Sequence, residues 1–194
     1  MTDRETARWR KRRIIYNNND GDDVVVAETE NNFKEGLMAR GDGELIDDLL
    51  NARSVPLIGT GVDSIWYSTC MSGLTFTHQT KLGGFHDKGI PRELIDRYDS
   101  DNLQIQIDYG REHGKEVFWS LRMNDTHDAW PGGSHHLVDG LAPFKQTHPE
   151  CLLKEPDAAS AHPGAKKRSW SAADFSRPEV RGHIFSLIQE VCQG

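Results

Sequence analysis

Three short apolar runs, at residues 13–17, 63–68 and 116–122, stand out from a chain that is otherwise rich in polar residues. Each run is dominated by β-branched and aromatic residues and does not alternate strictly between apolar and polar positions. This pattern is typical of strands in a parallel sheet that is covered on both faces. The runs therefore predict three buried, parallel strands.

Apolar residues at helical spacing occupy the intervals between these runs. Segments 30–40 and 44–53 carry this spacing between the first two strands, and segments 91–98 and 102–113 carry it between the second and the third. A last helix is expected from Ser176, which has the residue type of an N-cap, to the end of the chain. The alternation of strands and helices predicts an α/β fold.

A long segment at 128–176 follows the third strand; it is rich in Pro, Gly, His and Ser and shows little periodicity. In a barrel enzyme, such an insertion lies at the carboxyl face and walls the active site. The order gives about three βα units, whereas a complete (β/α)8 TIM barrel needs roughly 250 residues. We therefore expect a flexible segment at 1–12 and, over 13–194, a partial (β/α)8 TIM barrel. The alternative is a complete small α/β domain. If the chain folds alone, we expect its open sheet edge to pair with another copy or another chain.

Composition excludes several classes of function. The formal net charge of -7 argues against a nucleic-acid partner, because such surfaces carry a clustered basic excess. The three cysteines form no CxxC pair, which indicates neither a disulfide framework nor a zinc knuckle. No stretch resembles a secretory signal or a membrane span, so we expect no membrane partner and a cytoplasmic location for the chain as written. No GxGxxG, P-loop or GxSxG motif is present, and no cofactor is predicted.

The residues that follow each predicted strand are the candidates for chemistry, since ligands in parallel α/β folds bind beyond the carboxyl ends of the strands. After the third strand, Arg122 and Asn124 can bind a polyhydroxylated ligand, while Asp125 and His127 can hold or pass a proton and are the predicted catalytic pair. The alternative is a loop network in which these side chains satisfy one another.

Two further pairs are predicted to bind substrate. Asp20 and Asp22, after the first strand, can accept hydrogen bonds from sugar hydroxyls; an Asx-rich turn is the alternative, and a calcium loop is not predicted because its terminal Glu is missing. Trp66 and Tyr67, in the second strand, can stack on a sugar ring or pack in the core. The histidines show no HExxH spacing, so no metal site is predicted.

Three segments, 13–23, 61–67 and above all 118–128 with its Arg-Met-Asn-Asp-x-His-Asp sequence, resemble bacterial TIM-barrel proteins of the family-10-like glycosyl hydrolases. The resemblance covers most of the chain. It implies a carbohydrate substrate, and it implies that the catalytic carboxylates of a full barrel lie on later strands.

Three interpretations of function follow. The first is a glycoside hydrolase-like protein that acts on or binds a carbohydrate and that ends before the catalytic carboxylates of the barrel. The second is a non-catalytic, vestigial barrel unit that self-associates or binds a partner. The third is a metal-dependent hydrolase or isomerase that uses the Asp and His clusters.

Overall fold

The computed structural model describes residues 13–18, 23–24, 42–87, 89–129, 141–153 and 170–193. The segment at 1–12 and the helix predicted at 30–40 lie outside the described residues.

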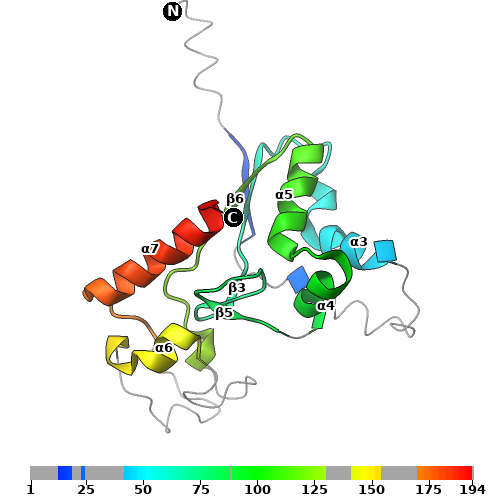
Figure 1. Ribbon diagram of the computed structural model, residues 1–194. Helices are drawn as coiled ribbons and strands as arrows, with labels where there is room; N and C mark the ends of the chain where they lie inside the picture. Colours follow the sequence, from blue (N-terminus) through cyan, green and yellow to red (C-terminus); the bar gives the residue numbers. More distant parts are fainter. Residues whose placement is uncertain are drawn as a thin grey trace, which may run out of the picture.

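A parallel sheet of three strands forms the centre of the described structure (Figure 1). Its strands are β1 (Ile15–Asn18), β2 (Ser64–Tyr67) and β6 (Glu116–Trp119), in the order β1-β2-β6. The register aligns Asn17 with Trp66 and Trp66 with Phe118. The three predicted strands are confirmed, each within a residue or two of its predicted start.

Four helices alternate with these strands much as the apolar spacing predicts: α3 (Asp42–Arg53), α4 (Gly89–Tyr98), α5 (Asn102–Glu112) and α7 (Pro178–Gln193). The side chain of Asp101 caps α5 by accepting hydrogen bonds from the backbone N–H groups of Leu103 and Gln104, both at 2.9 Å. The expected N-cap at Ser176 is wrong by one residue. Because α7 begins at Pro178, the residue before the helix is Arg177.

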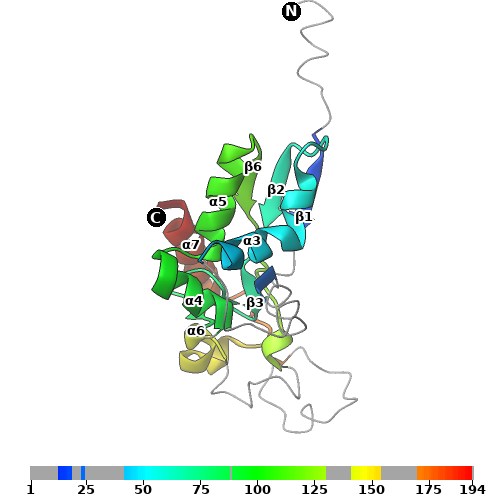
Figure 2. The same cartoon turned by 90° about the vertical axis from the view of Figure 1, so that its right-hand side faces the viewer.

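The helices cover one face of the parallel sheet (Figure 2). Ile65 and Tyr67 are buried there against Leu103 of α5, and Val191 of α7 packs against the same cluster. The opposite face carries Ile15, Trp66 and Phe118, which are 46%, 41% and 49% exposed. No described element covers these three side chains, which we call the open sheet face. The prediction of a sheet covered on both faces is therefore wrong for the described residues.

A second, smaller sheet follows β2 directly and was not predicted. It consists of β3 (Cys70–Ser72), β4 (Thr75–Phe76) and β5 (Gly84–Phe85), with β3 antiparallel and β5 parallel to β4. Strands of two or three residues are too short to show a period in the sequence. The small sheet lies at the carboxyl end of the parallel sheet, where Phe76 packs against Ile184 and Leu187 of α7 in one core cluster (Figure 1).

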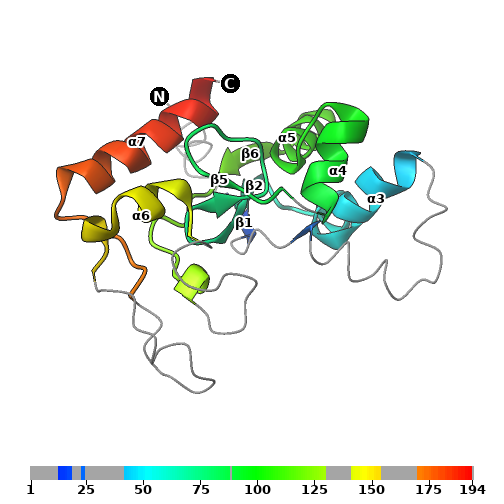
Figure 3. The same cartoon turned by 60° about the horizontal axis from the view of Figure 1, so that its bottom comes forward.

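The segment predicted as a long loop is partly helical where it is described. It contains the 3-10 helices η3 (His127–Ala129) and η5 (Pro149–Cys151) and the short α6 (Pro143–Thr147). These elements gather at the same end of the molecule as the small sheet (Figure 3). Another 3-10 helix, η2 (Val55–Leu57), follows α3.

The fold class is mixed α/β, as predicted, with a small parallel sheet and a small mixed sheet. Within the described residues the strands do not close into a barrel. No helix in the described part of the chain is long and apolar enough to cross a membrane.

Candidate functional site

The polar segment after β6 folds into a compact cluster around the carboxylate of Asp125. Its Oδ2 lies 2.9 Å from a guanidinium nitrogen of Arg122 and 2.7 Å from Nδ1 of His127. Its Oδ1 accepts hydrogen bonds from the backbone N–H groups of Gly73 and His127, both at 2.9 Å. The predicted residues Arg122, Asp125 and His127 are thus brought together, and β3–β4 supplies the backbone donor that completes the cluster.

The environment of Asp125 keeps its carboxyl group ionised. Burial by itself raises the pKa of Asp125, but the backbone hydrogen bonds from His127 and Gly73, the His127 ring and the Arg122 charge outweigh it. The net effect lowers the pKa below its ordinary value. An ionised carboxylate that accepts from two backbone N–H groups, Arg122 and the His127 ring holds these groups in place and is a poor nucleophile.

His127 is the half-open member of the cluster, with 50% of its side chain exposed against 2% for Asp125. Because the ionised Asp125 can only accept, Nδ1 of His127 donates to it. A carboxylate that orients an imidazole in this way is the arrangement found in general acid–base catalysis.

Asn124 links the cluster to the backbone of Ala173. Its Nδ2 donates to the carbonyl of Ala173 at 3.2 Å, and its Oδ1 accepts from the N–H of Ala173 at 2.8 Å. The side-chain amide therefore pairs with the backbone of the segment that leads into α7. This placement gives Asn124 a bracing contact in addition to its predicted role in binding.

A buried ion pair that the sequence did not indicate lies beside this cluster. Nζ of Lys145, on α6, contacts Oδ2 of Asp128 at 2.7 Å and the carbonyl of Asp125 at 3.2 Å. The other oxygen of Asp128 accepts a hydrogen bond of 2.5 Å from the hydroxyl of Ser171. Lys145 and Asp128 are each 1% exposed at the side chain, so the pair stabilises the loop and is closed to a ligand.

The end of β1 holds a second polar cluster. Asp23 is buried, and one of its oxygens accepts from Nδ2 of Asn18 at 2.7 Å while the other lies 3.2 Å from Arg53. Arg53 also donates to Oδ1 of Asn18 at 2.7 Å. The predicted binding residues include neither Asp23 nor Arg53, and the predicted Asp20 and Asp22 lie outside the described residues.

The two aromatic residues of β2 point to opposite faces of the sheet. Trp66 lies on the open sheet face, where its ring meets Phe118 edge-on at a centroid distance of 6.2 Å. Tyr67 is buried on the helix side, and its hydroxyl accepts from Nδ2 of Asn102 at 3.2 Å. Burial first, and then the charge of Asp23, raises the pKa of Tyr67 well above its ordinary value. Only Trp66 offers a ring edge or face that a ligand can reach.

The thiol nearest to the Asp125 cluster is inert. Cys70 is fully buried, and burial together with the charge of Asp125 raises its pKa to about 12. The thiolate is the nucleophilic form of cysteine, so Cys70 is not an activated nucleophile at neutral pH. Among the described residues, no group of three or more His, Cys, Asp or Glu side chains can hold a metal ion.

No protein-family model matches the chain, and no curated protein matches it.

Proposed function

We propose that the carboxyl end of the parallel sheet binds a carbohydrate and that the chain is part of a glycoside hydrolase-like (β/α) barrel. In this proposal His127 transfers a proton at the ligand, Asp125 orients the ring of His127, and Arg122 places the Asp125 carboxylate and donates to ligand hydroxyls. The observation that carries the proposal is the half-exposed His127 ring held at Nδ1 by a buried, ionised carboxylate.

The arrangement of the layers supports the barrel. Three parallel strands with all of their packed helices on one face match a segment of a barrel wall, in which helices form the outer layer and the other face of the sheet points inward. The Arg122–Asp125–His127 cluster follows the carboxyl end of β6, and the Asn18–Asp23–Arg53 cluster follows that of β1. Active sites of such barrels are built at this end.

The surroundings of Asp125 and His127 support different roles for the two residues. Asp125 has its oxygens occupied by Gly73, His127 and Arg122, so direct attack on an anomeric carbon would require these bonds to break. His127 keeps half of its side chain exposed, so a ligand can reach it. We therefore assign proton transfer to His127 and positioning to Asp125.

The test compares wild type with His127→Gln, and His113→Gln serves as the control because His113 is an exposed residue at the end of α5. Xylo-, gluco- and N-acetylgluco-oligosaccharides are titrated into each protein by calorimetry, and release of reducing ends is measured. We expect His127→Gln to bind the oligosaccharides at least about tenfold more weakly than wild type, because one hydrogen bond at a desolvated contact is lost. We expect no change in thermal unfolding. Absence of binding to all three series, or equal binding by His127→Gln, would contradict the proposal.

A second function, self-association or binding of a partner protein, is favoured by the open sheet face. Ile15, Trp66 and Phe118 place apolar surface from all three strands on one side of the sheet. Exposed contiguous apolar surface of this kind marks interaction sites. This function does not compete with sugar binding for the Asp125 cluster.

A further inference from the structure

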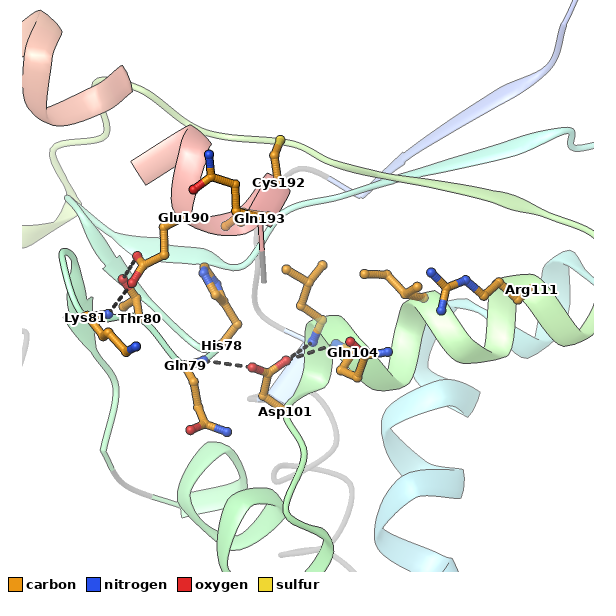
Figure 4. A pocket seen from close by; sticks show the side chains of 13 residues that line it. His78, Gln79, Thr80, Lys81, Asp101, Gln104, Arg111, Glu190, Cys192 and Gln193 are labelled. Atoms are coloured by element: carbon orange, nitrogen blue, oxygen red, sulfur yellow. Dashed lines mark hydrogen bonds between the residues drawn. The ribbon is translucent and has the colours of Figure 1, made fainter. Parts of the chain in front are cut away.

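A cavity of about 720 Å³ opens between α5, the carboxyl end of α7 and the segment 78–81 (Figure 4). Its volume lies in the range of small-molecule pockets. It shares no lining residue with the Asp125 cluster, so its occupancy can be tested separately from the function proposed above.

His78 is the polar side chain most deeply set in the wall of this cavity. The residue is only 4% exposed, and its Nδ1 lies 2.6 Å from the hydroxyl oxygen of Thr69. Among the described residues, Nε2 of His78 has no hydrogen-bond partner. The ring lies between Asp101 and Glu190 in the lining (Figure 4). A ring nitrogen in the wall of a cavity can form its hydrogen bond with a ligand or with water.

The hydrogen-bond network fixes which ring nitrogen carries the proton. Nε1 of Trp119, which is only a donor, donates to the Thr69 hydroxyl oxygen at 2.9 Å. Thr69 is fully buried, so its own hydroxyl proton needs an acceptor, and Nδ1 of His78 is the one within reach. Burial lowers the pKa of His78, which keeps the ring neutral at pH 7. A neutral ring that accepts at Nδ1 carries its proton on Nε2 and presents an N–H donor to the cavity.

Two carboxylates flank this donor and are held in place. Glu190 accepts from the hydroxyl of Thr80 and the N–H of Lys81, both at 2.6 Å, which fastens α7 to the segment 78–81. Asp101 accepts from the N–H of Gln79 at 2.9 Å while it caps α5. Each carboxylate oxygen has lone pairs beyond these bonds and can accept from a ligand hydroxyl.

The charges of the lining select for a neutral ligand. Asp101 and Glu190 are balanced by Lys81 and Arg111, so the cavity has no net charge to attract an ion. A ligand anion would face the two carboxylates, and a ligand cation would face the His78 N–H. A hydroxyl group satisfies both, because it accepts from the N–H and donates to a carboxylate. Apolar Leu103, Ile107 and Val191 complete the wall and suit the C–H face of a sugar ring.

We propose that this cavity is a second binding site, for a neutral saccharide of one or two rings, with the His78 N–H and the Asp101 and Glu190 carboxylates as its polar contacts. The site is independent of the Asp125 cluster and does not require that cluster to be catalytic.

The experiment follows the amide signals of Gln79, Lys81 and Gln104 in ¹⁵N-labelled protein during titration with glucose, mannose and N-acetylglucosamine. Saturable shifts with at least one of the three are expected. Gluconate and glucosamine, the charged analogues, should need about tenfold higher concentrations. No saturable shift with any neutral sugar, or tighter binding of either charged analogue, would overturn the proposal.

Two variants test the location of binding. Gln104→Trp fills the cavity from an exposed position on α5, and Gln189→Trp makes the same change at an exposed position of α7 outside the lining. Gln104→Trp should weaken the binding that shifts the Gln79 and Lys81 amides at least about tenfold, while Gln189→Trp should keep it. Equal binding by Gln104→Trp and Gln189→Trp would overturn the assignment.

The tautomer gives a third readout that needs no ligand. Two-bond ¹H–¹⁵N spectra of the histidine rings should find the proton of His78 on Nε2. A proton on Nδ1 would remove the donor from the cavity and overturn the proposal.

Discussion

Nζ of Lys145 lies 2.7 Å from Oδ2 of Asp128, and the two side chains are each 1% exposed. This buried pair holds α6 against the loop that carries Asp125 and His127. The space beside it is kept open by Gly73, whose φ of +59° lies in the left-handed region. A Cβ added at Gly73 would overlap the Asp128 carboxylate and come within 3.1 Å of Nζ of Lys145.

Gly73→Ala should therefore lower the free energy of unfolding far more than backbone strain alone would. Gly59→Ala is the matched control, because Gly59 also has a positive φ, of +77°, but a Cβ there meets nothing within 4 Å. We expect a loss of roughly 1–2 kcal/mol for Gly59→Ala from left-handed strain. Gly73→Ala should lose about 3–5 kcal/mol, the cost of breaking a buried ion pair. Denaturant unfolding of both variants measures the difference, and equal losses would show that the pair tolerates displacement.

Acid should remove the stability that Asp125 contributes. Its pKa in the folded protein is lowered, so the contribution is present above the unfolded-state pKa of about 4 and is lost as pH falls through the lower folded-state pKa. Asp125→Asn should be less stable than wild type by about 1–3 kcal/mol at pH 7, because a charged acceptor for the Gly73 and His127 N–H groups is replaced.

The difference between wild type and Asp125→Asn should shrink when unfolding is measured at pH 3. Asp47→Asn, at an exposed position of α3, serves as the control and should keep the wild-type profile. A constant difference between wild type and Asp125→Asn from pH 7 to pH 3 would mean that the Asp125 carboxyl does not titrate differently in the folded state.

The sequence predicts the parts of this fold that depend on local pattern. The strand around Val117 and the helix that carries Leu103 and Ile107 follow from β-branched runs and helical spacing, which are properties of neighbouring residues. The small sheet around Phe76 escapes prediction because its strands, although close together in the chain, have only two or three residues each and show no period. The open sheet face escapes it too, since residues 66 and 118 carry the same side chains whether or not another layer covers them.

The residues of the candidate site also fall into those that the sequence predicts and those that it does not. Arg122, Asp125 and His127 are close in sequence, so their cluster can be expected from the segment that follows a strand. The contacts of Lys145 with Asp128 and of His78 with Thr69 join residues from different elements, and their residue types alone favour solvent or metal roles as readily as buried ones. Tertiary structure determines which polar side chains are buried, and this burial cannot be predicted from the spacing of residues in the sequence.

The open sheet face leads to a prediction about assembly. Trp66 and Phe118 are neighbours in register, and their exposed rings form an edge-on pair on the side of the sheet that no described helix covers. Aromatic rings in such positions dominate the energy of protein interfaces. We therefore expect the chain to self-associate in a concentration-dependent manner, which sedimentation velocity over a hundredfold range of concentration would measure.

The variant that tests this assembly is the double substitution Trp66→Thr with Phe118→Thr, because threonine keeps a high strand propensity while it removes both rings. The double variant should raise the dissociation constant at least about tenfold. Phe185→Thr is the control, since Phe185 is 60% exposed and belongs to α7, outside the open sheet face. If wild type remains monomeric at every concentration, or if Phe185→Thr weakens association as much as the double variant, the open sheet face is not the surface through which the copies meet.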